Sequence, residues 1–117
     1  NAKRVYIIGA GSSLALATFL SHYLSLVFDA VQLINATSDA QILQQLVHIG
    51  AGDALIGISF PRYSKKAAKA LRYASDRGAS VIAITDSTLS PLASCAQQVL
   101  LAKSDMVSFV DSLVGSR

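Results

Sequence analysis

The sequence predicts an α/β fold in which helices cover both faces of a doubly wound, five-stranded parallel sheet. Three observations predict this fold. Short apolar blocks rich in β-forming residues alternate with longer segments of helical periodicity, as in successive strand–helix–strand units. Glycine and polar residues separate these blocks. The length of 117 residues suits one domain, and no repeat or low-complexity linker divides residues 1–117.

Five segments are predicted as strands because each is a short apolar run bounded by glycine or polar residues. They are 4–8, 30–34, 53–59, 80–85 and 98–102. The third is apolar almost throughout, as expected of a central parallel strand buried on both faces. No run approaches the roughly 20 apolar residues of a membrane span. The start lacks a secretory leader pattern, and its first two residues are expected to be a cloning remnant.

The first helix is predicted at 12–28, with Ser12 or Ser13 as its N-cap. Its polar residues form one narrow stripe at helical spacing, on an otherwise apolar cylinder. They are Thr18, Ser21, His22 and Ser25. A helix with so much apolar surface is expected to be covered on more than one side. The sequence therefore predicts a subunit interface on this helix.

A second helix is predicted at 40–49, between the second and third strands. Ser38 or Asp39 is expected to cap its start, and Gly50 and Gly52 are expected to stop it. His48 lies near the predicted end, where a charged imidazole suits the helix dipole.

The third helix is predicted from Ser64, its N-cap, to the terminating Gly78. Its predicted packing face consists of Ala67, Leu71 and Ala74, and another face consists of Lys65, Lys69 and Arg72. A last helix is predicted to begin at 105 and to lack a terminator, which is typical of a truncated end.

The net charge of +3 is concentrated in one segment. Residues 62–77 contain six basic residues against Asp76 alone, whereas the rest of the chain has a net charge of −2. Neither interleaved aromatic residues nor a nucleic-acid-reading motif accompanies this patch. A solvated helix face and a ligand-binding surface both remain open for Lys69, Arg72 and Arg77. The single cysteine, Cys95, excludes an internal disulfide, fits a reducing cytoplasm and is expected to be a small buried side chain.

Ligands of doubly wound sheets bind beyond the carboxyl ends of the strands, near the point where the strand order reverses. The loop GAGSS follows the first strand there. It resembles a dinucleotide-binding turn, but Leu14 replaces the third small residue and no acidic residue follows the second strand, so NAD is not expected. Gly9 and Gly11 fit either a tight turn or the close approach of a ligand. Ser12 and Ser13 can contact an oxyanion or a sugar hydroxyl, and one of them can also cap the helix.

The loop after the third strand, SFPRYS, is the stronger candidate for a ligand site. Lys65 and Lys66 open a helix whose N-terminus is already positive, and Arg62 precedes them, which costs about a few tenths of a kcal/mol each. A bound phosphate would reverse this cost. We therefore predict an anion site at Ser59, Arg62, Ser64 and Lys65, with Lys66 in solvent. Tyr63 either stacks on a sugar or packs against the protein.

These loops, with the segment ASDRGASVIAITDSTLSPLA at 74–93, resemble the SIS (sugar isomerase) domain, in the version that forms the C-terminal half of RpiR-type transcription regulators. The resemblance covers essentially the whole chain. It implies a five-stranded parallel sheet, dimerisation and binding of a phosphosugar. The usual phosphate loop of the family is S-x-S-G-x-T. Ser59 matches its first serine and Ser64 replaces its threonine, whereas Pro61 and Arg62 stand where serine and glycine are usual.

The resemblance implies phosphate contacts for Ser59 and Ser64 and sugar contacts for Ser12 and Ser13. It implies nothing for Arg62, whose predicted role rests on charge alone. In the resembling regulators a separate N-terminal helix-turn-helix domain binds DNA. No such segment is present in this sequence, so we expect an effector domain with weak DNA affinity of its own.

Catalysis is not expected. Isomerisation of a sugar phosphate needs a base, and the isomerase branches of the resembling family use glutamate, which this sequence lacks. His22 and His48 are expected to be surface or structural residues. Asp86 follows the fourth strand near the expected pocket, but it can equally cap the local turn.

The sequence therefore predicts a cytoplasmic, homodimeric, non-catalytic phosphosugar sensor without metal, cofactor or membrane partner. Two alternatives remain. One is a sugar-phosphate aldose–ketose isomerase subunit, and the other is a dimerisation module with a degenerate pocket. Neither the particular sugar nor the direction of regulation can be read from the residues.

Overall fold

A computed structural model describes residues 4–9, 11–35, 37–60, 64–89 and 92–101. The side chain of Ser12 is also outside the description. Four sequence predictions therefore fall outside the described residues, namely the roles of Ser12, Arg62 and Tyr63 and the helix expected from 105.

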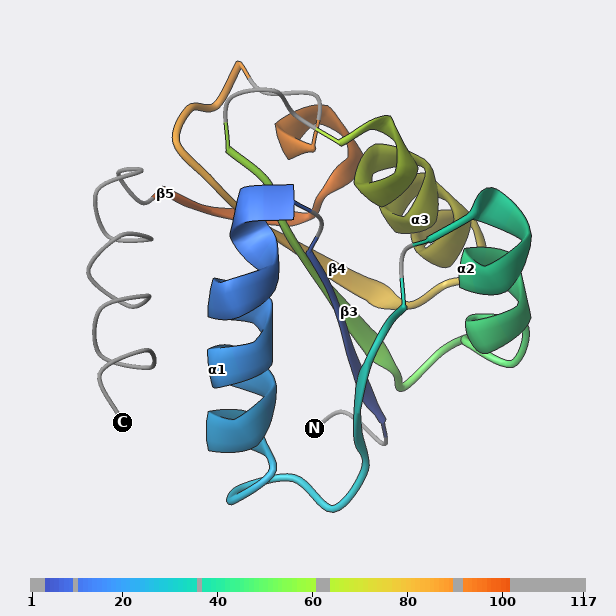
Figure 1. The fold of residues 1–117 in the computed structure, drawn as a ribbon. Coiled ribbons are helices and arrows are strands. Elements are labelled where there is room, and N and C mark those ends of the chain that lie inside the picture. Colours follow the sequence, from blue (N-terminus) through green and yellow to red (C-terminus); the bar gives the residue numbers. More distant parts are fainter. Residues whose placement is uncertain (1–3, 10, 36, 61–63, 90–91, 102–117) are drawn as a thin grey trace.

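All five predicted strands are present, and they form one parallel sheet with the order β2-β1-β3-β4-β5. Their bounds are β1 Val5–Gly9, β2 Val31–Leu33, β3 Ala54–Ile58, β4 Ser80–Thr85 and β5 Gln98–Leu101. The chain adds β2 on one side of β1 and then crosses to β3 on the other, so the strand order reverses between β1 and β3 (Figure 1). This arrangement confirms the predicted doubly wound sheet.

The helices cover both faces of the sheet, as predicted. Helix α1 (Leu14–Leu24) lies on one face, whereas α2 (Asp39–Gln45) and α3 (Lys65–Asp76) lie on the other (Figure 1). Two short 3-10 turns, Gly11–Ser13 and Ala93–Cys95, complete the described helical elements. Two apolar clusters fill the layers, the larger beneath α2 and α3 and the smaller beneath α1. In the described part of the chain, no helix is both long and apolar enough to span a membrane.

Helix α3 packs as its sequence pattern predicts. Its buried residues are Ala67, Ala70, Leu71 and Ala74, whereas Lys65, Lys69 and Arg72 are not buried. Ser64 caps the helix through its Oγ, which accepts a hydrogen bond from the N–H of Ala67 at 3.1 Å. Gly78 follows the helix with φ +88°, the left-handed backbone that glycine favours at a helix end.

Helix α1 is shorter than the predicted 12–28. Its C-cap is Ser25, and the following turn brings Phe28 back toward the sheet while Leu26 and Val27 are exposed. Ser13 takes the N-cap position, but its hydroxyl makes no capping bond. The reason is that Ser13 already has helical dihedral angles, φ −85° and ψ −8°, whereas a capping side chain needs extended backbone.

Helix α2 also ends earlier than predicted, at Gln45 rather than beside Gly50. Arginine side chains from elsewhere bind carbonyl oxygens of the segment that follows. Arg77 donates to the carbonyls of Ile49 at 3.1 Å and Val47 at 3.4 Å, and Arg4 donates to that of His48 at 2.9 Å. His48 therefore lies beyond the helix. At the start, Ser38 is the cap, because its Oγ accepts from the N–H of Gln41 at 3.2 Å.

The buried side chain of Asp53 joins two segments at the amino-terminal ends of the strands. Asp53 is buried, and its Oδ2 accepts hydrogen bonds from Arg4 Nη2 and from the N–H of Gly50, both at 3.1 Å. The hydrogen bond to Asp53 raises the pKa of the Arg4 guanidinium. Since Arg4 precedes β1 and Asp53 precedes β3, the ion pair joins the starts of the two central strands.

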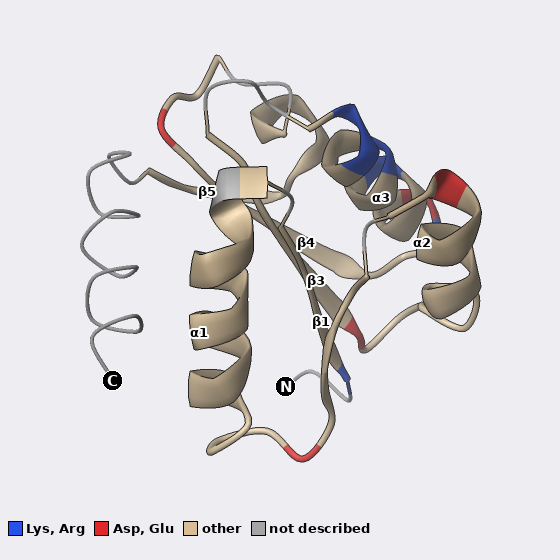
Figure 2. Ribbon diagram, viewed as in Figure 1, with Lys and Arg blue, Asp and Glu red and all other residues tan. Residues whose placement is uncertain are grey.

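Figure 2 shows the blue of Lys and Arg gathered at the start of α3, but several basic side chains of residues 62–77 contact separate partners. Lys69 Nζ lies 3.5 Å from Asp39 Oδ2, Arg72 lies 3.8 Å from the sulfur of Cys95, and Arg77 holds the segment after α2. Cys95 is half-buried. Lys69, Arg72 and Arg77 thus each contact a different neighbour, and all three residues remain exposed.

Candidate functional site

The carboxyl ends of β1, β3 and β4 meet at one edge of the sheet, at the reversal of strand order. The three predicted ligand loops start at this edge, after Gly9, Ile58 and Thr85. Parallel strands place their following loops side by side. The fold therefore brings the predicted loops to one edge, and their side chains decide what the edge can bind.

The two glycines of the first loop have different roles. A Cβ on Gly9 would lie 2.8 Å from the carbonyl oxygen of Ser13 and 2.9 Å from Ala17 Cβ, so glycine lets α1 start directly against the end of β1. Gly11 has φ +59°, and no described atom lies within 4 Å of the position that its Cβ would take. The close approach is thus made by the helix at Gly9, and the unusual backbone occurs at Gly11.

The two serines of the third loop lie in one hydrogen-bonded turn. Ser59 is 3% exposed, and its Oγ accepts a hydrogen bond from the N–H of Ser64 at 3.0 Å. Ser64 in turn uses its Oγ to cap α3. Each hydroxyl oxygen therefore holds the turn, while each hydroxyl proton can still be donated to an anion.

The start of α3 offers further donors. The N–H groups of Lys65 and Lys66 occupy the first two helical positions, where no intrahelical acceptor exists. The side chain of Lys65 is exposed. Lys66 is exposed, as expected, and its Nζ donates to the carbonyl oxygen of Thr37 at 3.1 Å. Lys66 thereby ties the start of α3 to the loop after β2.

A cavity of about 460 Å³ opens at this edge, beside the first loop. Its described lining residues are Gly9, Gly11, Leu14, Leu33, Ile34, Asn35 and Thr37. A volume between about 300 and 1,000 Å³ is typical of small-molecule sites. The cavity lies between the loops after β1 and β2, and neither Ser59 nor Ser64 lines it, whereas the prediction placed the ligand between the first and third loops.

Of the predicted site residues, Gly11 alone is among the described residues that line the cavity, and Ser13 is buried beside it at the start of α1. Sequence reasoning missed Asn35 and Thr37. The signal was present in LINATS, where polar residues directly follow an apolar strand. The segment lacks the acidic residue of a dinucleotide site, but its amide and hydroxyl are groups that can contact a neutral ligand.

The end of β4 contributes a buried hydroxyl and a half-buried acid. Thr85 is buried, and its Oγ1 donates to Asp86 Oδ1 at 3.5 Å. Asp86 lies at the expected edge, yet it is not a lining residue of the cavity. Within the described ranges, no group of three or more His, Cys, Asp or Glu side chains could hold a metal ion.

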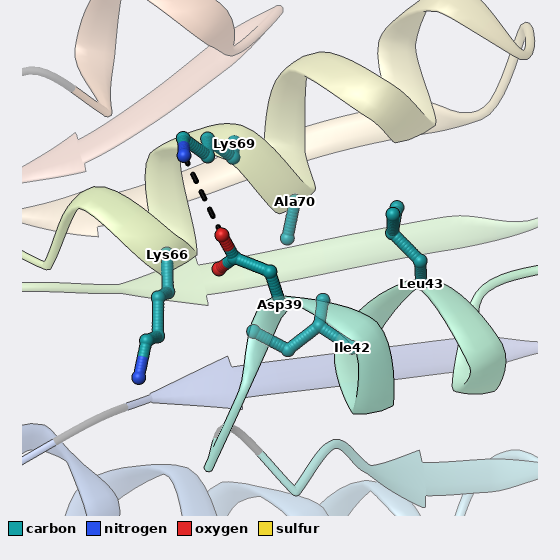
Figure 3. Close-up of a pocket in the computed structure, with 6 residues that line it drawn as sticks. All are labelled: Asp39, Ile42, Leu43, Lys66, Lys69 and Ala70. Atoms are coloured by element: carbon teal, nitrogen blue, oxygen red, sulfur yellow. Dashed lines mark hydrogen bonds and ion pairs between the residues drawn. The ribbon is translucent and has the colours of Figure 1, made fainter.

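A second cavity of about 250 Å³ lies between α2 and α3 (Figure 3). Its lining consists of Asp39, Ile42, Leu43, Lys66, Lys69 and Ala70. In Figure 3 Lys69 is directed at Asp39, whereas Lys66 extends away from both, and its Nζ reaches the carbonyl of Thr37. The cations of this cavity already have partners, so it offers less to an anion than the start of α3.

Comparison with known proteins adds a family and several structural neighbours. The family model described as "SIS domain" matches residues 1–116. No curated protein sequence matches the chain. The RpiR transcription factor from Sphaerobacter thermophilus (sugar isomerase domain) is similar, with 31% identity and a TM-score of 0.81, over 98% of this chain and 69% of that one.

Two further solved structures share the fold at lower identity. Vibrio vulnificus NanR, complexed with ManNAc-6P, has 21% identity and a TM-score of 0.77, over 98% of this chain and 48% of that one. E. coli CFT073 c3406, in complex with a phosphosugar, has 18% identity and a TM-score of 0.72, over 97% of this chain and 68% of that one. The chain thus spans about two thirds of the RpiR structure and about half of NanR.

Proposed function

The chain belongs to the SIS domain family, and from this premise we propose that it is the phosphosugar-binding effector domain of an RpiR-type transcriptional regulator, acting by binding rather than by turnover. The turn that joins β3 to α3 is the observation that carries this proposal. It combines two serine hydroxyls, free helix N–H groups and the charge of Lys65 at the ligand-binding edge of the sheet.

Phosphate binding at this turn has a simple physical basis. The first N–H groups of a helix lack acceptors, and the helix dipole makes this end positive. A phosphate there would accept hydrogen bonds from the N–H groups of Lys65 and Lys66 and from the hydroxyls of Ser59 and Ser64. It would also offset the repulsion between the dipole and the lysine charges. The sugar would extend toward the cavity beside Gly11, because Lys66 links the two places through Thr37.

The regulator role is favoured over the isomerase role by the sequence likeness to the RpiR domain and by the absence of glutamate from the sequence. NanR holds ManNAc-6P and c3406 holds a phosphosugar as well, which supports the ligand class. In the full regulator, DNA would be bound by another domain and this domain would report the ligand. We place the protein in the cytoplasm, where phosphorylated sugars are found.

Replacing Ser64 with Asp tests the anion site. Aspartate is as good an N-cap as serine, so α3 is expected to stay folded, while its carboxylate occupies the place of the phosphate. When a sugar phosphate is present at one hundred times its dissociation constant, the wild-type protein should gain about 2.7 kcal/mol of stability. We expect Ser64→Asp to lose most of this gain, measured by thermal shift with ManNAc-6P, arabinose 5-phosphate, glucose 6-phosphate and ribose 5-phosphate.

Gln44→Glu provides the matched control, since it makes the same change in net charge on an exposed residue of α2 that lines neither cavity. It should respond to ligand as the wild type does. An equal ligand response in Ser64→Asp would show that the anion binds elsewhere. No response of the wild type to any sugar phosphate would support the degenerate dimerisation module.

Incubation of the protein with aldose and ketose phosphates, followed by NMR, tests the absence of turnover. We expect the substrates to remain unchanged and to exchange no carbon-bound proton with solvent. Proton exchange or interconversion at a rate proportional to protein concentration would instead support the isomerase alternative.

A further inference from the structure

The cavity beside Gly11 has a chemistry unlike that of the turn before α3. None of its described lining residues is charged, and Leu14, Leu33 and Ile34 supply apolar surface. An anion would gain nothing from such a lining, because burial without a cationic partner costs free energy. The C–H faces and the neutral hydroxyl or amide groups of a sugar fit it better.

Two lining side chains carry hydrogen-bonding groups, Asn35 and Thr37. The hydroxyl of Thr37 is already bonded to Gln41 Oε1. The side-chain amide of Asn35 takes part in none of the hydrogen bonds of the described residues. An amide has both donors and an acceptor, which suits the hydroxyls of a sugar. Asn35 is thus the described lining residue with hydrogen-bonding capacity to spare.

The backbone of Asn35 is held in place from α2. The N–H of Asn35 donates to Gln45 Oε1 at 2.9 Å, and Gln45 Nε2 donates to the carbonyl oxygen of Asn35 at 2.8 Å. Gln45 Nε2 also lies 2.9 Å from the carbonyl oxygen of Gln41, one turn earlier in the helix. One glutamine amide therefore pairs with both backbone groups of Asn35, so the loop is fixed before a ligand arrives.

We propose that Asn35 is a specificity-determining residue, which hydrogen-bonds a hydroxyl or N-acyl group of the sugar in the cavity between the loops after β1 and β2, and that Gln45 positions it. This inference rests on the proposed function, because it assumes that a phosphosugar binds at this edge. It assigns the neutral part of the ligand to the second loop and leaves the phosphate to the start of α3.

Asn35→Ala tests the contact in the full chain, with dissociation constants measured by calorimetry for ManNAc-6P, arabinose 5-phosphate, glucose 6-phosphate and inorganic phosphate. Loss of one neutral hydrogen bond should weaken binding of the preferred sugar phosphate about three- to tenfold. Affinity for inorganic phosphate should change less than about twofold, because a neutral contact to the sugar is absent from that complex. The preference among the sugars should narrow, because the discriminating contact is gone.

Gln45→Ala tests positioning, and Gln44→Ala is its matched control on the exposed side of the same helix. Gln45→Ala should reduce the ratio of affinities between the preferred sugar phosphate and the others, as Asn35→Ala does. It should not weaken the binding of inorganic phosphate. Gln44→Ala should leave all affinities unchanged. If Gln45 were merely structural, Gln45→Ala would lower the stability of the domain without altering the ratio of affinities between two sugar phosphates.

The outcomes separate this inference from the proposed function. If the wild type binds a sugar phosphate and Asn35→Ala binds each member of the panel with the same affinity as the wild type does, the inference is wrong and the proposed function stands. The inference is also wrong if Asn35→Ala weakens the binding of inorganic phosphate as much as that of the sugar phosphates. If the wild type binds none of the sugar phosphates, the proposed function fails and the inference fails with it.

Discussion

Gly57 shows how closely one helix approaches the centre of the sheet. It lies in β3, and a Cβ built on it would be 2.3 Å from Leu71 Cδ1. Leu71 is fully buried and belongs to the larger apolar cluster. The missing side chain at Gly57 thus provides the space that Leu71 fills, and α3 can lie directly on the sheet.

Gly57→Ala should destabilise the domain by about 1 to 3 kcal/mol, because the new methyl group overlaps a packed side chain. Leu71→Ala should cost about 2 to 5 kcal/mol through the cavity it leaves. The double variant should cost less than the sum of the two, since truncation of the leucine side chain makes room for the methyl group. Urea denaturation of all four proteins measures this coupling.

Gly50→Ala is the control for this cycle, because its Cβ would lie 3.7 Å from the carbonyl oxygen of Arg77, an ordinary contact. It should be close to neutral. Additive effects of Gly57→Ala and Leu71→Ala would show that Leu71 can move aside at no cost and that the fit at Gly57 is not tight.

At the scale of elements, the three described α-helices begin in two different ways. Ser38 and Ser64 cap α2 and α3 through their hydroxyls, each from extended backbone. Helix α1 instead emerges from a 3-10 turn, and Ser13 makes no capping bond. The difference follows from the 3-10 turn Gly11–Ser13, which gives Ser13 helical dihedral angles before α1 begins.

Ser64→Ala should therefore cost about 0.5 to 2 kcal/mol, because the N–H of Ala67 loses its acceptor at a helix start. Ser13→Ala should not incur this capping cost. Amide hydrogen exchange can separate the two cases, since Ser64→Ala should speed exchange in the first turn of α3 specifically. Equal protection of that turn in wild type and Ser64→Ala would contradict the assigned cap.

Elements also end where tertiary partners bind their carbonyl groups. The segment after α2 is apolar and periodic enough to continue the helix, and the sequence predicted that it would. Instead, Arg4 donates to the carbonyl oxygen of His48, which lies 44 residues later in the chain. Arg77 donates to that of Ile49, which lies 28 residues earlier. Such long-range hydrogen bonds leave no local pattern, so the earlier end of α2 was beyond sequence reasoning.

At the scale of the whole molecule, the two faces of the sheet are covered unequally. Helices α2 and α3 share one face, whereas α1 is the one described helix on the other (Figure 1). Apolar residues on the outer side of α1 and its following turn are exposed, Tyr23 by 60%. The others are Leu14, Phe19, Leu26 and Val27. This exposure supports the sequence expectation that a further surface covers the helix.

The polar stripe of α1 is consistent with such a cover. Thr18, Ser21 and Ser25 donate their hydroxyls to carbonyl oxygens of the same helix, at 2.8, 2.8 and 2.7 Å. Hydroxyls satisfied within the helix do not need water, so these three residues can be buried at little cost.

We expect the protein to be a dimer that uses the outer face of α1. The double variant Phe19→Glu/Tyr23→Glu should shift it to monomer in analytical ultracentrifugation, because burying two carboxylates in an apolar interface is costly. Val47→Glu, an exposed apolar position after α2 on the other face, should leave the oligomeric state unchanged. A wild type that is monomeric at all concentrations would exclude this interface.

The order of strands and helices was predictable from the sequence alone, because buried parallel strands and amphipathic helices leave periodic patterns that depend only on neighbouring residues. The cap at Ser64, the packing face of α3 and the edge of the sheet where the predicted loops start followed from the same local rules. The early end of α2, the bond from Lys66 to Thr37 and the cavity beside Asn35 were decided by tertiary structure. Each of these depends on groups that are distant in the chain and meet only when the sheet has formed, so no local pattern of residues encodes them.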